Sequence, residues 1–464
     1  MQRWDVIVVG AGLGGMLTGA ILARRGRRVL VLEREPQPGG RLRSYDVDGF
    51  VVDCGAFLWP NKYLDQAFAA AGVTDFIGSE IPAHEVMRIY IQGLNGKRFA
   101  FPWLGRDHAA LDDTIREVYR ITPEEFRRFG ALLGRLAQLD AADIAALMPV
   151  TLHDWLAANV NDATVANALL RTLMLFGTYD GPSASAGEFI RLMQRNRSGG
   201  TPAKPESCGA NAIGGVRALV HAIRAALERN GADIRLGTTV DEIVVEHGRA
   251  TGVLAHGALP FQERFVADAI VSNLPIWALF DIVPAAHFPP RFVEHARHYA
   301  KVGGTVSVAY AFNTLPALRE TREPDHFRGW TRLLVGSERT FGGGLFWSSH
   351  HSPHNAPPGK HILQGMRLVP QTLLTDQALV DRIIADFDGL VREIYRDLDA
   401  ALLWRRRWVT RDGTEYMISA VPRPDVRAPS VGNLYFVGET INLPSIQMDA
   451  AAHSALECVR LLDT

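Results

Sequence analysis

A glycine-rich hexapeptide near the N-terminus has the spacing that lets a main chain come close to a phosphate group. It reads Gly10-Ala11-Gly12-Leu13-Gly14-Gly15 and follows the apolar run 4–9. In such a turn Gly10 allows a sharp change of direction, Gly12 lets the backbone approach a pyrophosphate, and Gly15 lets a following helix pack closely. The hexapeptide therefore predicts a dinucleotide-binding turn, with Ala11 and Leu13 among its backbone contacts.

The segments around this turn provide the setting that dinucleotide binding requires. Residues 4–9 have the composition of a short buried strand, residues 13–25 have the apolar spacing of a helix, and residues 28–32 form a second apolar run. The N-terminus of such a helix offers free N–H groups and a positive dipole end to phosphates. Glu33 follows the second strand, where an acid can accept hydrogen bonds from a ribose, and the adjacent Arg34 is a further candidate contact.

A second glycine pair indicates which dinucleotide is expected. Within Pro38-Gly39-Gly40-Arg41-Leu42, the arginine adds a cation and the glycines add backbone donors near the pyrophosphate. The segment resembles the Gly-Gly-Arg extension of the superfamily of FAD-dependent amine oxidases, protoporphyrinogen oxidases and phytoene desaturases. Asp53-Cys54-Gly55-Ala56-Phe57 resembles that superfamily's Asp-x-Gly element, which runs close to the flavin. The resemblance implies FAD as the cofactor, with Gly40, Arg41 and Gly55 beside it.

A segment in the middle of the chain resembles a further part of the same FAD-binding domain. Gly214-Gly215 precedes a helix expected over 217–230, and two strands are expected over 233–236 and 240–246. In the superfamily, the residue at the position of Val240 touches the adenine through its backbone. The residues alone predict only an ordinary helix and strands here, so the role of Val240 rests on the resemblance.

The C-terminal segment resembles the superfamily's closing motif. A buried strand expected over 434–437 leads to Gly438-Glu439 and to a last helix over about 450–462. Glu439 replaces the usual Asp, and an acid there can hydrogen-bond the ribityl chain. Backbone N–H groups around Gln447 and Met448 are expected near N1 and O2 of the flavin, where they stabilise negative charge. The residues 448–451 look most like the phytoene desaturase-related branch.

These segments predict an α/β fold for the FAD-binding domain and an α+β architecture for the whole chain. The FAD-binding domain is expected to be Rossmann-like and discontinuous, and the substrate domain to consist of a mixed sheet and helices. The FAD-binding domain is expected to comprise 1–80, 205–275 and 405–464, and the substrate domain 81–204 and 276–404. Residues 104–194 read as helical, with a capping box that starts at Thr122, and 196–211 read as a loop. Strands are expected over 305–310, 341–347 and 361–367, and a helix over 379–398.

The reaction is less well defined by the sequence than the cofactor, and no catalytic residue is predicted. Flavin amine oxidases commonly keep a lysine on the strand that matches 304–310, and this stretch has none. We therefore expect dehydrogenation or isomerisation of a small apolar or unsaturated metabolite, with electrons passed to O2 or another acceptor. A flavin amine oxidase that releases H2O2 stays an alternative. Trp59 and Tyr416 are candidate substrate contacts.

A flavin-free, prenyl-protein escort-like binding protein is an alternative of another class. Glu33, Gly40-Arg41 and Gly438-Glu439 argue against it, because a chain without FAD has no use for all of them. No second glycine motif of this type follows a strand, so a built-in NADPH site is not expected.

Composition and charge exclude several other classes. The formal net charge is -1, which favours neither nucleic acid nor an anionic membrane. The three cysteines lie far apart, so we expect buried thiols and a reducing, cytoplasmic setting. Residues 350–354 hold three histidines but read as a solvated loop and not as a metal site. Residues 6–23 lack charge, yet five glycines argue against a membrane span, whereas peripheral membrane contact and oligomeric state stay open.

Overall fold

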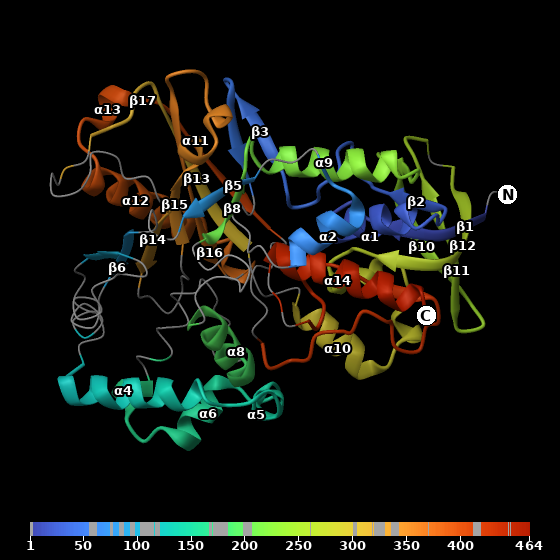
Figure 1. Ribbon diagram of the computed structural model, residues 1–464, viewed down its shortest axis with the longest axis horizontal. Coiled ribbons are helices and arrows are strands. Elements are labelled where there is room, and N and C mark those ends of the chain that lie inside the picture. Colours follow the sequence, from blue (N-terminus) through green and yellow to red (C-terminus); the bar gives the residue numbers. More distant parts are fainter. Residues whose placement is uncertain are drawn as a thin grey trace.

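The computed structural model describes most of the chain. The described residues are 3–54, 63–74, 78–82, 88–92, 98–102, 116, 121–166, 169, 184–197, 207–259, 261–299, 304–317, 319, 330–335, 343–369, 371–411, 419–443, 445 and 447–464. They form two seven-stranded sheets, two small two-stranded sheets and several groups of helices. The first large sheet lies at the end of the molecule that carries both termini, and the second lies at the opposite end (Figure 1).

The first sheet is built around the two strands predicted on either side of the glycine turn. Its order is β10-β11-β12-β1-β2-β9, and β18 also pairs with β12. β1 is parallel to β2 and β12, and β12 is parallel to β18, so the carboxyl ends of these strands lie at one edge. The strands are β1 (Arg3–Val9), β2 (Val29–Leu32), β9 (Asp233–Arg235), β10 (Thr239–Glu246), β11 (Arg249–His256), β12 (Glu263–Ser272) and β18 (Leu434–Phe436).

Four helices pack against one another beside this sheet (Figure 1). Helix α1 contacts the other three, and every residue from Leu13 to Ala23 is buried. Gly19 makes this close packing possible, because a Cβ there would lie 2.9 Å from Cδ1 of Leu227 on α9. The helices are α1 (Leu13–Arg24), α2 (Tyr63–Ala71), α9 (Val216–Arg229) and α14 (Gln447–Leu462).

The second sheet has the order β17-β13-β16-β15-β14-β6-β7. Alternate residues of β13, among them Val306 and Val308, pack on α12 (Gln377–Ile394), whereas Ala309 and Ala311 pack with Phe50 on the opposite face. The strands are β6 (Arg88–Gln92), β7 (Arg98–Pro102), β13 (Gly304–Phe312), β14 (Trp330–Val335), β15 (Gly343–Trp347), β16 (His361–Val369) and β17 (Leu402–Thr410).

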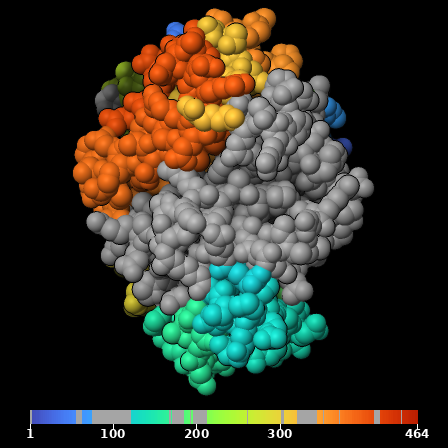
Figure 2. All heavy atoms as spheres, turned by 90° about the vertical axis from the view of Figure 1, so that its left-hand side faces the viewer, coloured from blue at the N-terminus to red at the C-terminus, as the bar shows by residue number. Residues whose placement is uncertain are grey.

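The helical region expected between 104 and 194 contains four described helices that form a separate lobe (Figures 1 and 2). The predicted capping box is present, since Thr122 accepts from Glu125 N and the Glu125 carboxylate accepts from Thr122 N. Phe129, Leu132 and Leu136 form the core of this lobe. The helices are α4 (Pro123–Leu136), α5 (Ala141–Leu147), α6 (Leu152–Asn159) and α8 (Ala186–Arg197).

The interpretation of 196–211 as one loop is wrong at both ends. Helix α8 continues to Arg197, and Ser207–Ala212 forms strand β8, which pairs with β5 (Gly78–Pro82). The hydrogen bonds of β8 come from a strand far away in sequence, so local composition did not reveal it. The other short elements are β3 (Ser44–Val47), β4 (Phe50–Asp53), η3 (Ile276–Asp281), η4 (Ala285–His287), α10 (Pro290–His298), α11 (Ser348–His351), η6 (Pro353–Asn355), η7 (Gln371–Leu373) and α13 (Leu398–Ala401).

The predicted fold class is confirmed, whereas the domain boundaries stay a proposal. Two placements bear on these boundaries. Strand β17 pairs with β13 in the second sheet, and the segment 276–299 packs in the core of the first. We therefore propose to assign residues 276–299 to the first unit and residues 402–410 to the second. Among the described residues, none of the helices is both long enough and apolar enough to cross a bilayer.

Candidate functional site

The glycine turn lies where β1 ends and α1 begins, at the carboxyl edge of the first sheet. Gly10 has φ +97°, and its N–H donates to Leu32 O at 2.8 Å. Gly12 is the N-cap of α1, yet no side chain caps this end, and the first turn holds no acidic residue. A buried helix N-terminus without a cap needs an external acceptor for its N–H groups. The turn therefore fits a bound anion such as a pyrophosphate.

Asn273, which sequence reasoning missed, supports the turn from the neighbouring strand. It follows β12, its N–H donates to Val9 O at 2.8 Å, and its Nδ2 donates to Gly10 O at 3.4 Å. A Cβ on Gly12 would lie 2.5 Å from Nδ2 of Asn273, and one on Gly14 would lie 2.9 Å from its Oδ1. The glycines are therefore required by this side chain as well as by a ligand. Its only sequence signal is a polar residue directly after a buried parallel strand.

Glu33 lies beside the turn, as predicted. Its side chain is buried, Oε2 accepts from Ala11 N at 2.7 Å and Oε1 accepts from Glu35 N at 3.0 Å. The carbonyl of Glu33 also accepts from Thr238 N at 2.8 Å, which brings the segment before Val240 alongside. Val240 itself is buried in β10. Arg34 is exposed, with Nε 3.5 Å from Glu35 Oε1.

The second glycine pair lies directly against the first. Gly39 N donates to Ala11 O at 2.7 Å, and a Cβ on Gly40 would lie 3.3 Å from Cα of Gly12. Arg41 Nη1 lies 2.7 Å from Glu439 Oε1, a contact between residues 398 positions apart. The structure thus brings the second glycine pair and the C-terminal motif to one place, and pairs the two charged residues that the sequence treated separately.

The C-terminal motif continues from Glu439 into α14. Gly438 N donates to Ser454 Oγ at 2.8 Å, so α14 holds the strand end in place. The Thr440 hydroxyl is buried and has no hydrogen-bond partner among the described residues. Gln447 begins α14 with φ +55°, and Met448 is buried. A buried hydroxyl without a partner beside Glu439 fits a polar ligand such as the FAD chain.

Asp53, at the end of β4, is buried where the two large sheets meet. Its Oδ1 accepts from Ser44 Oγ at 2.5 Å and from Val216 N at 3.1 Å, so it also caps α9. Its own N–H donates to Gln364 Oε1 on β16 at 2.8 Å, whereas Oδ2 has no partner among the described residues. Burial raises the pKa of the Asp53 carboxyl to about 6. Burial likewise raises the pKa of the neighbouring Cys54 thiol to about 12, so this cysteine stays protonated.

The face of the second sheet opposite α12 lies next to β4. On β13 this face presents Thr305, Ser307, Ala309 and Ala311, and on β16 it presents Ile362, Gln364, Met366 and Leu368. These eight side chains are uncharged, and small ones lie in the middle. The stretch 304–310 forms the predicted strand and contains no lysine. The part of this face on β13 and β16 is therefore uncharged, whereas on the neighbouring β17 the exposed Arg406 is paired in register with Ala309.

The remaining predictions have mixed outcomes. Gly55, Trp59 and Tyr416 lie outside the described residues. The prediction of a solvated loop over 350–354 is only partly correct. His350 and His354 are exposed, whereas Ser352 and the adjacent Asn355 are fully buried. The described residues include no group of three or more His, Cys, Asp or Glu side chains that could hold a metal ion. Cys458 is buried, Cys54 is half-buried, and the Cys208 side chain is not among those described.

The parallel strands of the first sheet, with an uncapped glycine turn, an acid after β2 and a C-terminal helix at the same edge, have the arrangement of dinucleotide-binding oxidoreductases. Within this class, residues 13–462 match the model of the flavin-containing amine oxidoreductases, and the chain belongs to that family. The predicted superfamily, the FAD cofactor and the enzyme class are thereby confirmed.

Curated relatives include carotenoid desaturases. The chain is 28% identical to hydroxyneurosporene desaturase of Rubrivivax gelatinosus over 316 residues, which cover 60% of this chain and 55% of that protein. It is 27% identical to all-trans-zeta-carotene desaturase of Myxococcus xanthus over 490 residues, which cover 93% of this chain and 88% of that protein. The first match spans about half of its relative, and the second spans most of it.

Solved structures share the fold at low sequence identity. An oxidoreductase from Methanosarcina mazei superposes with a TM-score of 0.70 at 18% identity, covering 99% of this chain and 100% of the other. Wild-type putrescine oxidase bound to putrescine superposes with a TM-score of 0.67 at 15% identity, and the superposition covers 100% of this chain and 99% of the other. At these identities the similarity concerns the fold alone.

Proposed function

We propose that this FAD-dependent oxidoreductase is a dehydrogenase of the desaturase type. Its substrate is a small, largely apolar or unsaturated metabolite, from which a hydride and a proton leave two adjacent carbon atoms. FAD, when bound, supplies the acceptor for the hydride and its two electrons. O2 or another acceptor then takes the electrons. The names of the carotenoid desaturases that the chain resembles agree with this substrate class.

The observation that carries this proposal is the uncharged face of β13 and β16. An amine substrate is recognised by acids, polar groups or aromatic cages, whereas a hydrocarbon requires only shape and the exclusion of water. Thr305 and Ser307 are buried on this face, and Met366 joins it to the core of the helical lobe. Such a surface can orient an apolar chain beside the flavin, while the proton lost from the second carbon goes to solvent.

The residues proposed to hold FAD are those expected from the sequence, and many of the described ones lie around the carboxyl edge of the first sheet. The N–H groups at the start of α1 face the pyrophosphate, and Glu33 accepts from the adenosine ribose. The pair of Arg41 and Glu439 holds the middle of the cofactor together with the Thr440 hydroxyl. The full proposed set is Gly10, Ala11, Gly12, Leu13, Gly15, Glu33, Arg34, Gly40, Arg41, Gly55, Val240, Gly438, Glu439, Gln447 and Met448.

An anaerobic reduction assay tests the substrate class. Protein saturated with FAD is mixed with polyene hydrocarbons in detergent micelles, or with a panel of amines, while the visible flavin absorbance is followed. We expect polyenes to bleach the flavin and to yield products that have lost two hydrogen atoms, as seen by mass spectrometry. Bleaching by amines alone, followed by peroxide release in air, would instead establish the amine oxidase alternative.

A further inference from the structure

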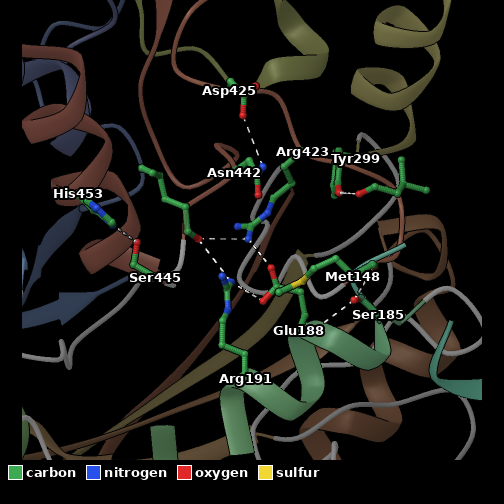
Figure 3. Close-up of polar contacts among 12 residues, drawn as sticks. Met148, Ser185, Glu188, Arg191, Tyr299, Arg423, Asp425, Asn442, Ser445 and His453 are labelled. Atoms are coloured by element: carbon green, nitrogen blue, oxygen red, sulfur yellow. Dashed lines mark hydrogen bonds and ion pairs between the residues drawn. The ribbon is translucent and has the colours of Figure 1, made fainter. Parts of the chain in front are cut away.

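A buried ion cluster connects α8 to the segment that leads into α14 (Figure 3). Glu188 of α8 is 8% exposed and accepts hydrogen bonds from Arg191 of the same helix and from Arg423, whose Nη2 lies 2.8 Å from Oε1. The Arg423 side chain is 6% exposed. Both guanidinium groups also donate to the carbonyl oxygen of Leu443, at 3.4 Å from Arg423 and 3.5 Å from Arg191. Two charged donors, oriented by one carboxylate, thus hold this carbonyl.

The segment around Leu443 is fixed at further points. Asn442 N donates to Pro424 O, and Ser445 N donates to Leu443 O, both at 2.8 Å. The Ser445 hydroxyl lies 3.0 Å from Nδ1 of His453, two turns into α14 (Figure 3). Gln447 then begins the helix in a left-handed conformation, φ +55°. Residues 442, 443 and 445 are thus tied to Pro424, Arg423 and His453, respectively, shortly before α14 begins.

The other side of the cluster is anchored in the helical lobe. Ser185 Oγ accepts from Glu188 N at 3.1 Å and donates to Met148 O at 2.8 Å. Ala184 forms an antiparallel bridge with Ser419, and the Tyr299 hydroxyl donates to Val421 O. The strand of chain that carries Arg423 is thus held between α8 and α10. Movement of the lobe would be transmitted to the Leu443 carbonyl through two charged hydrogen bonds.

We propose that Glu188 and Arg423 are positioning residues for the flavin. Through the carbonyl of Leu443 they hold the chain that leads into α14, and so they position the backbone N–H groups of Gln447 and Met448. This inference rests on the proposed location of those groups at N1 and O2 of the flavin. A displacement of about 1 Å in such a site can lower the reaction rate up to about a hundredfold. Breaking a buried ion pair from one side also leaves a charge without its partner.

FAD binding to Arg423→Gln and Glu188→Gln tests the proposal without any substrate. The readouts are the FAD dissociation constant, from quenching of flavin fluorescence during titration of apoprotein, and the midpoint potential of the bound flavin. We expect the dissociation constant to rise about tenfold, which corresponds to about 1.4 kcal/mol of binding free energy, and the midpoint potential to change. Arg405→Gln is the control, because it breaks an ion pair between β17 and Asp388 of α12, away from α14, and should leave both values at the wild-type level.

A purely structural role predicts a different pattern. In that case the three variants lose thermal stability, the FAD dissociation constant stays within about twofold of wild type and the midpoint potential is unchanged, which would overturn the proposal. If Arg423→Gln does not fold, Arg191→Gln replaces it, because the Arg191 side chain is 27% exposed and donates to the same carbonyl. Failure of the desaturase assay leaves this test intact, since only FAD binding is measured.

Discussion

At the scale of single residues, the cofactor site depends on how closely the main chain and one amide can approach each other. Gly12 and Gly14 lie against the side chain of Asn273, which bridges the end of β12 to the carbonyl of Gly10. Glu33 holds the same turn from the other side through Ala11 N. The turn is therefore already shaped by the protein, so that FAD binding needs little rearrangement there.

Gly12→Val is expected to abolish FAD binding. A Cβ at this position would lie 2.5 Å from Asn273 Nδ2, and the branched side chain would also fill the space for the pyrophosphate. We expect the purified variant to retain less than about a tenth of the wild-type FAD, measured by the ratio of visible flavin to protein absorbance. Gly130→Ala on α4 is the control, because a Cβ there meets nothing within 4 Å. Normal flavin content in Gly12→Val would show that this turn does not carry the pyrophosphate.

At the scale of elements, α14 positions α2 as well as the end of β18. Asp449 Oδ1 accepts from the N–H groups of Tyr63 at 2.6 Å and Leu64 at 3.1 Å, which satisfies two donors at the start of α2. One turn further along α14, His453 stacks on Tyr63 with ring centroids 3.7 Å apart. The two helices are therefore tied together at the edge where the flavin is expected.

Asp449→Ala should destabilise the protein by about 1–3 kcal/mol, because it leaves two buried N–H groups without their acceptor. The measurement is urea unfolding, combined with FAD titration. Asp140→Ala serves as the control, since Asp140 caps α5 in the helical lobe and is exposed. Both variants should lose stability, but only Asp449→Ala should bind FAD more weakly. Equal FAD affinity in the two would contradict a link between α14, α2 and the cofactor.

At the scale of the whole molecule, the two large sheets are joined by buried polar contacts around Asp53. Its N–H donates to Gln364 on β16, and Gly214 N, just before α9, donates to Ser352 Oγ at 2.7 Å. These contacts connect the cofactor-binding sheet with the sheet proposed to face the substrate. The carboxyl of Asp53 is buried at this junction, with one oxygen that lacks a partner among the described residues.

Stability should fall as pH rises through the pKa of Asp53. Burial raises this pKa from 3.8 to about 6, so the folded state binds the proton more tightly than the unfolded state. The contribution of protonated Asp53 to the free energy of unfolding is therefore fully present below about pH 4 and is lost as the pH rises past about 6. The positive charge of Arg217 lowers this pKa, but its effect is smaller than that of burial.

Asp53→Asn removes this titration. Between pH 4 and pH 7 its free energy of unfolding should therefore rise by up to about 3 kcal/mol relative to that of the wild type. Urea unfolding at each pH unit measures the difference between the two proteins. Asp381→Asn is the control, because the hydrogen bond from Arg407 lowers the pKa of Asp381, so no such gain is expected. A constant difference between Asp53→Asn and wild type across this range would show that Asp53 does not titrate there.

The parts that could be predicted from the sequence are those whose causes are local. The predicted helix 13–25 is found as Leu13–Arg24, and the capping box at Thr122 is present, because turns and caps depend on neighbouring residues. Strand β8 was missed and the buried role of Ser352 was not foreseen, since their partners lie far away in the sequence.

The sequence by itself determined the cofactor class, because glycine spacing, the acid after the second strand and the closing motif each have a direct chemical reason. Only the tertiary structure decided that Arg41 pairs with Glu439, that Asn273 supports the glycine turn, and that Glu188 and Arg423 hold Leu443. The first two of these contacts, and that between Glu188 and Arg423, join residues more than about 200 positions apart. Their geometry follows from the pairing of β12 with β1 and from the packing of α8 against the C-terminal segment, for which short-range pattern carries no information.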